Sequence, residues 1–168
     1  MKPVIALVAI AIALVAQAAI SRLTVGGTVA LDLALVVVTY LALIWGPLAG
    51  MLAGSAAGLL QDTLGSGVIG IGGLAKTIVG YLAGVVAQQF ILTAPAPRFV
   101  IFMGATLVHA VVFIGFYTLL GLRSFPSPLP SVVAQAAGNG VIGLGVFLVV
   151  ERLPPVIERR RTRRRRSR

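Results

Sequence analysis

Six polar side chains in or beside apolar stretches are the candidates for chemistry: Asp32, Asp62, Lys76, His109, Gln135 and Asn139. A charge held at mid-membrane costs roughly 2.5–3.5 kcal/mol on insertion scales, so such groups persist where they pair or where function needs them. The chemistry open to them is ion pairing, hydrogen bonding between helices, or proton transfer.

The two aspartates and the lysine are charged residues of predicted apolar segments. Asp62 follows the third apolar segment, residues 47–60, and Lys76 lies about two turns into the fourth, residues 68–92. An Asp62–Lys76 contact is therefore sterically plausible. Asp62 either orders the loop at the membrane face for a partner or is a helix-end carboxylate among lipid headgroups. Asp32 lies one turn into the second segment, where it either reaches the headgroup region or acts as a first-turn anion favoured by the helix dipole.

His109 lies in the middle of the fifth apolar segment, and Gln135 and Asn139 share one face of the sixth. We expect His109 to bridge to Asn139 or to Gln135, because polar side chains at such depth bond across helices. The alternative is a proton relay or ligand site. A lone histidine with two amides lacks the charge-paired series that a relay would use.

Enzymatic motifs are not found in the sequence. There is no His/Glu metal spacing, and Gly70-Ile-Gly-Gly73 is too short and too apolar for a phosphate loop. The chain also has no cysteine, which excludes disulfides and thiolate metal sites. The sequence therefore predicts a non-enzyme with no catalytic residue, no metal and no cofactor.

Composition indicates which elements position these residues. Of 168 residues, 58% are hydrophobic and 11% charged, against roughly 25% charged in soluble domains. A membrane-crossing helix needs about 20 apolar residues. We predict an all-α integral membrane protein with about six transmembrane helices in one bundle over residues 1–151. The expected spans are 4–20, 29–45, 47–60, 68–92, 99–120 and 132–150.

Two of these segments have alternative interpretations. The segment 47–60 is short and rich in glycine and alanine, so it could be re-entrant. The first segment, with Lys2 and Ala16-Gln17-Ala18, resembles a cleavable signal peptide. Five further apolar stretches favour a first membrane helix instead.

Small residues recur every four positions in two consecutive segments. The series are Gly46, Gly50, Gly54, Gly58 and Asp62, then Gly72, Lys76, Gly80, Gly84 and Gln88. Residues four apart form one ridge of a helix, and a ridge without side chains lets a neighbouring backbone approach closely. We expect the third and fourth segments to pack as a hairpin, with dimerisation or a partner helix on these glycines as the alternative.

The net charge of +10 is concentrated at the C-terminus. Nine of the fourteen basic residues follow Glu151, among them Arg159, Arg160, Arg161, Arg163, Arg164, Arg165 and Arg166. We expect residues 152–168 to form a disordered basic tail, because Pro154-Pro155 disfavours continuation of the preceding helix. The tail is a topology signal or a ligand for anionic lipid, with an acidic partner as a further option and no nucleic acid.

With six spans, both termini share one side. That side carries Lys2, Arg98 and the tail, eleven basic residues against Arg22 and Arg123 on the other. Because basic loops stay inside, both termini are predicted to be cytoplasmic.

The stretch from Asp32 to Gly84 resembles the rod shape-determining protein MreD family. The resemblance lies in Asp32, Tyr40-Leu-Ala-Leu and Gly46, then Gly54-Ser-Ala-Ala-Gly58-Leu-Leu-Gln-Asp62, and then Val79-Gly80-Tyr81-Leu82-Ala83-Gly84. Lys76 is not part of the family pattern. Outside this third of the chain the agreement is in hydropathy alone.

This resemblance implies a non-enzymatic scaffold of the bacterial inner membrane that supports cell shape and lateral peptidoglycan synthesis. The implied partners are an MreC-like scaffold protein and, through it, MreB, RodA and a penicillin-binding transpeptidase. A fold similar to the substrate-binding S components of energy-coupling-factor transporters is also implied. The alternative function is therefore a substrate-binding membrane subunit of a vitamin-type transporter.

Overall fold

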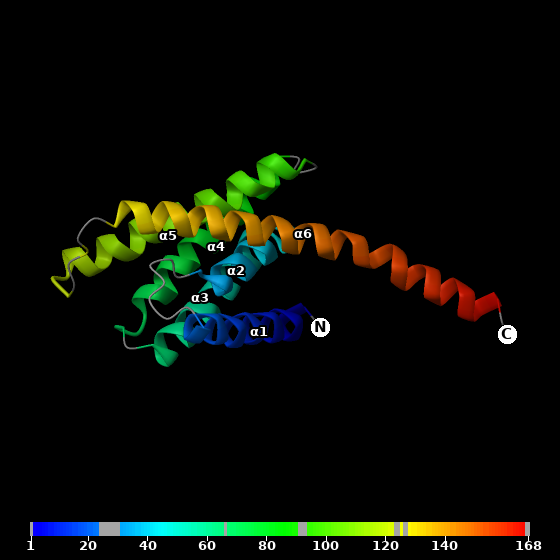
Figure 1. Cartoon of the computed structure of the whole chain (residues 1–168), viewed down its shortest axis with the longest axis horizontal. Coiled ribbons are helices and arrows are strands. Elements are labelled where there is room, and N and C mark those ends of the chain that lie inside the picture. The colour runs from blue at the N-terminus through cyan, green and yellow to red at the C-terminus, as the bar shows by residue number, and fades with distance from the viewer. Residues whose placement is uncertain are drawn as a thin grey trace.

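The computed structural model describes residues 2–23, 31–65, 67–90, 94–122, 125 and 128–166. For Lys2, residues 21–23 and the residues beyond Glu151 it describes only the backbone. Within the described residues the chain forms six helices (Figure 1). These are α1 (Lys2–Leu23), α2 (Leu33–Trp45), α3 (Pro47–Leu64), α4 (Ile71–Gln89), α5 (Pro95–Leu119) and α6 (Leu129–Arg166). The all-helical prediction is confirmed.

Successive helices run in opposite directions, so the chain starts and ends on the same side of the bundle (Figure 1). The amide hydrogen of Asp32 reaches Asn139 and the Tyr40 ring contacts Phe147, so α2 and α6 run parallel. We call the end with Asp32 and the start of α4 the pocket end. We call the end with the N-terminus and Glu151 the tail end.

Helix α2 is the centre of the bundle. It contacts each of the other helices, and one of its turns buries Ala34, Leu35, Val36 and Val38 almost completely. Its 13 residues span only about 20 Å at about 1.5 Å per residue. Because its neighbours enclose it, this short helix does not itself have to match the thickness of a bilayer.

Helices α3 and α4 form the tightest pair, through their glycines. A Cβ on Gly50 would overlap the Gly80 carbonyl, and one on Gly54 would overlap the Lys76 carbonyl. Gly58 meets the backbone at Gly73 in the same way. The predicted hairpin is confirmed, and the two glycine ridges face each other rather than outward.

The ends of this hairpin are also fixed by glycine and proline. Gly46 closes α2 with a left-handed φ of 89°, and Pro47 starts α3 directly after it. A Cβ on Gly84 would overlap Pro47. Helix α3 continues to Leu64 and α4 begins at Ile71. Asp62 therefore lies within the last turn of α3, although the predicted span ended at residue 60.

Among the described residues, four helices are long and apolar enough to cross a membrane: Pro3–Ile20, Ile71–Gln89, Pro95–Leu119 and Leu129–Glu151. Helix α2 is too short by this measure, and the glycines and polar end of α3 lower its hydropathy. The structure thus supports a multi-pass membrane protein. Six full crossings, and whether α3 is re-entrant, stay predictions.

Helix α6 continues through Pro154 and Pro155 to Arg166, although the two prolines were expected to discourage the helix. Each proline lacks an N–H donor for the carbonyl one turn earlier, but the backbone keeps its helical course. The side chains of the seven tail arginines named above lie outside the described residues. The disorder of the tail and its lipid or topology role stay predictions.

Candidate functional site

A buried ion pair joins α2 to α4 at the pocket end. The Lys76 ammonium lies 2.6 Å from Asp32 Oδ2, and the side chains are only 3% and 6% exposed. Each of these ions needs the other as a close partner, because a charge buried without its counter-ion would be strongly destabilising. The partner of Lys76 is thus Asp32, and the Asp62–Lys76 contact considered from the sequence is wrong.

Asp32 also begins α2. Its Oδ1 accepts the Leu35 amide hydrogen at 2.9 Å, which makes it the N-cap. Gln17 of α1 accepts the Leu33 amide hydrogen at 3.0 Å. Capping explains why this aspartate stands where α2 starts, and it agrees with the interpretation of Asp32 as a helix-start anion.

Asn139 connects α2 and α5 to α6. Its Oδ1 accepts the Asp32 amide hydrogen at 3.1 Å, and its Nδ2 donates to Thr106 Oγ1 at 3.1 Å. Thr106 in turn donates to the Phe102 carbonyl at 3.0 Å. The Asn139 amide thus bonds Asp32 and Thr106 rather than His109, and the expected His109–Asn139 bridge is wrong.

His109 instead approaches the ion pair. Its Nε2 lies 3.2 Å from Lys76 Nζ. An ammonium group has only donors, so Nε2 must accept in this contact and the ring proton then belongs on Nδ1. The ring stacks on Phe113 at a centroid distance of 5.6 Å. Lysine, aspartate and histidine therefore form one cluster across α2, α4 and α5.

Asp62 holds the start of α4. Its Oδ2 accepts the amide hydrogens of Gly70 at 2.8 Å and Gly73 at 3.1 Å. A Cβ on Gly72 would overlap Asp62 Oδ1, so this glycine leaves room for the carboxylate. Asp62 thus closes the turn between the two hairpin helices, and a contact of that turn with a partner stays a prediction.

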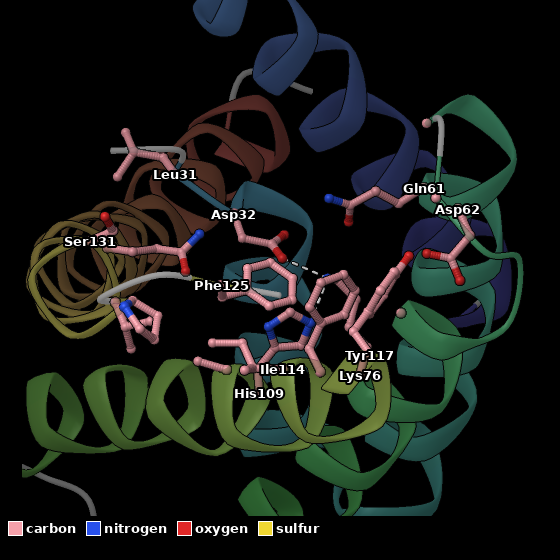
Figure 2. Close-up of a pocket in the computed structure, with 18 of the residues that line it drawn as sticks. Leu31, Asp32, Gln61, Asp62, Lys76, His109, Ile114, Tyr117, Phe125 and Ser131 are labelled. Carbon is pink, nitrogen blue, oxygen red and sulfur yellow. Dashed lines mark hydrogen bonds and ion pairs between the residues drawn. The ribbon is translucent and has the colours of Figure 1, made fainter. Parts of the chain in front are cut away.

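These residues surround a pocket of about 550 Å³ at the pocket end (Figure 2). Asp32, Lys76 and His109 lie at its inner wall, and Gln61 and Asp62 approach from α3. Aromatic rings complete the lining, contributed by Phe113, Tyr117 and Phe125. Gln135 lines the same pocket, so it and His109 share a surface.

Two pocket residues were missed by the sequence analysis. Gln17 was treated only as part of a signal-peptide-like pattern, and Gln61 only as a landmark of the family resemblance. Both are half-buried amides in apolar helices, and an isolated amide in such a helix is the signal that could have identified them. The Gln61 Oε1 atom is buried without a hydrogen-bond partner among the described residues.

The tail end carries a second ionic contact that was also missed. Arg98 donates to both Glu151 carboxylate oxygens, at 2.8 and 2.6 Å, and its guanidinium lies 4.1 Å from the Phe147 ring centroid. Tyr40 packs edge-on against the same ring at 5.1 Å. An arginine at the start of α5 opposite a carboxylate at the end of the α6 span was the available signal.

The site does not resemble a metal centre. Among the residues that the structure describes, no three His, Asp or Glu side chains gather in a way that could hold a metal ion. What the cluster offers is a desolvated ion pair beside a histidine, at the wall of an open pocket.

Comparison with known proteins gives one match. The family model described as rod shape-determining protein MreD matches residues 1–152. No curated protein and no solved structure matches the chain, so the likeness to transporter S components stays a prediction. The family match covers all six helices up to the end of the α6 span, beyond the region from Asp32 to Gly84 that carries the resemblance in sequence. The chain therefore belongs to the MreD family of rod shape-determining proteins.

Proposed function

We propose that this chain is a scaffold of the rod elongation complex in the bacterial inner membrane, where it supports cell shape and lateral peptidoglycan synthesis by binding an MreC-like partner. The family match over residues 1–152 carries the proposal. Proteins of the MreD family are shape-determining and non-enzymatic. MreB, RodA and a penicillin-binding transpeptidase would be linked indirectly, and anionic lipid would meet the tail.

The packing of the hairpin argues against its glycine ridges as the partner surface. Because Gly50, Gly54 and Gly58 are covered by α4, they are not available to a partner helix. The outward faces of the helices remain, among them those of α1 and α3, where Ile12 is 64% exposed and Leu52 60% exposed. In a membrane these faces contact lipid or another helix.

The pocket supports a second candidate function, the substrate-binding subunit of a small-molecule transporter. Its volume of about 550 Å³ falls within the range of roughly 300–1,000 Å³ typical of ligand sites. A transporter subunit of this kind would associate with an energising ATPase module. The family assignment favours the scaffold.

Depletion in a rod-shaped host tests the scaffold function. We expect cells to lose their rod shape on depletion and to regain it when the full chain is supplied. Affinity purification from gently solubilised membranes should recover an MreC-like protein. Cells that stay rods, or recovery of an ATPase module in place of the scaffold protein, would contradict the proposal.

Site-specific photo-crosslinking locates the partner surface. A photoreactive residue at Leu52 is expected to crosslink to another protein, because the side chain faces outward. The control is Phe102 of α5, where a photoreactive phenylalanine analogue replaces an aromatic side chain that is only 1% exposed and should give crosslinks within the chain only.

A further inference from the structure

The pocket has features that internal packing does not explain. It is open at the end of the bundle where α2, α4 and α6 begin. Gln61 and Asp32 point toward the same space from opposite sides, above aromatic rings (Figure 2). A fully packed interior would fill this space with apolar side chains.

The charges at the pocket wall favour a cationic ligand. Asp32 and Asp62 contribute two carboxylates against the single ammonium of Lys76. Because Lys76 and Asp32 pair at 2.6 Å, the excess negative charge among the described residues belongs to Asp62, whose Oδ2 accepts two backbone amide hydrogens. The Gln61 Oε1 atom adds a buried acceptor with no hydrogen-bond partner among the described residues. An acceptor of this kind is satisfied by an N–H or O–H donor.

The aromatic side chains indicate the rest of the ligand. Phe113 and Tyr117 pack together at a centroid distance of 4.7 Å, and Phe125 meets Tyr117 edge-on at 6.1 Å. Ring faces attract cations and provide apolar contact area. A ligand with an ammonium group and an apolar body would match both parts of the lining.

We propose that this pocket binds a small organic amine in its protonated form. The Gln61 amide turns its Oε1 acceptor from the wall toward the ammonium group, near the carboxylates, and the apolar body lies against Phe113, Tyr117 and Phe125. This site does not depend on the scaffold function, and its failure would leave that function intact.

Three probes that share one apolar body and differ in charge test the proposal. These are 3-phenylpropylamine, 3-phenylpropanol and 3-phenylpropionate, each titrated against the full chain in lipid nanodiscs and followed by ligand-observed NMR. We expect the amine to bind at least about tenfold more tightly than the alcohol, as befits a charge-assisted hydrogen bond, and the carboxylate to bind most weakly. Equal binding of all three, or tightest binding of the carboxylate, would overturn the proposal.

Two variants and a control assign any binding to the pocket. Gln61→Leu should weaken amine binding about tenfold, and Ser131→Trp should block it by filling the mouth of the pocket. The control Gln89→Leu removes an exposed amide at the opposite end of α4 and should bind the amine as the original chain does. Unchanged binding in both pocket variants would overturn the proposal.

A segment of a partner protein is the competing occupant. A photoreactive residue at Ser131 in living cells distinguishes it. A crosslink there to another protein, together with no saturable binding of the amine, would overturn the proposal. Saturable binding of 3-phenylpropylamine to the purified chain without the photoreactive residue supports the proposal.

Discussion

At the scale of single residues, the buried Lys76–Asp32 pair is the feature with the largest energetic consequence. Lys76→Met leaves the Asp32 carboxylate without its cation, and breaking a buried pair in this way costs about 3–5 kcal/mol. We expect a corresponding loss of unfolding free energy, measured by denaturant titration in micelles with circular dichroism.

The double variant Asp32→Asn with Lys76→Met is the matched comparison. It removes both charges while asparagine keeps the N-cap acceptor for Leu35, so we expect it to recover most of the stability lost in Lys76→Met. If the single variant were as stable as the original chain, the ion pair would not hold α2 and α4 together.

Asp62 makes a smaller and more local contribution. Asp62→Ala removes the acceptor shared by the Gly70 and Gly73 amide hydrogens, which should cost about 0.5–2 kcal/mol as the loss of a helix cap. Hydrogen exchange read out by NMR should show faster exchange at these two amides, and unchanged exchange at Gly104 in α5. If the Gly70 and Gly73 amides exchanged as slowly in the variant as in the original chain, the capping role would be contradicted.

At the scale of elements, the glycine ridges make a clear distinction between positions. Gly54→Ala places a methyl group against the Lys76 carbonyl and should cost about 1–3 kcal/mol as overpacking. The control is Gly104→Ala in α5, where nothing lies within 4 Å of the new Cβ. This control should be neutral or stabilising by up to about 1 kcal/mol through helix propensity. Equal melting temperatures for both variants would show that the hairpin is not packed through glycine.

The same elements show how far the sequence could be interpreted. The hairpin was predictable because a repeat of four residues is a local pattern that marks one helix ridge whatever its surroundings. The partners of Lys76 and His109 were not predictable, because they depend on how α2 and α5 are rotated and shifted against α4. The sequence neighbour Asp62 was the available candidate for Lys76, but the Gly70 and Gly73 amide groups hold it.

At the scale of the whole molecule, the pocket end and the tail end differ in charge and should face opposite sides of the membrane. The described chain brings the starts of α1 and α5 and the end of the α6 span to one end (Figure 1). Arg98 bonds Glu151 at this end, where the basic tail begins. Basic segments are retained in the cytoplasm. The pocket should therefore open to the outside of the cytoplasmic membrane.

Because the chain has no cysteine, single-cysteine labelling tests this orientation without background. Ser131→Cys lies at the pocket end and Gln89→Cys at the tail end, and both side chains are exposed. A membrane-impermeant maleimide added to spheroplasts should label Ser131→Cys, whereas Gln89→Cys should react only after the membrane is opened with detergent. The reverse pattern would place the pocket in the cytoplasm, and labelling of both positions from outside would mean that α4 does not cross the membrane.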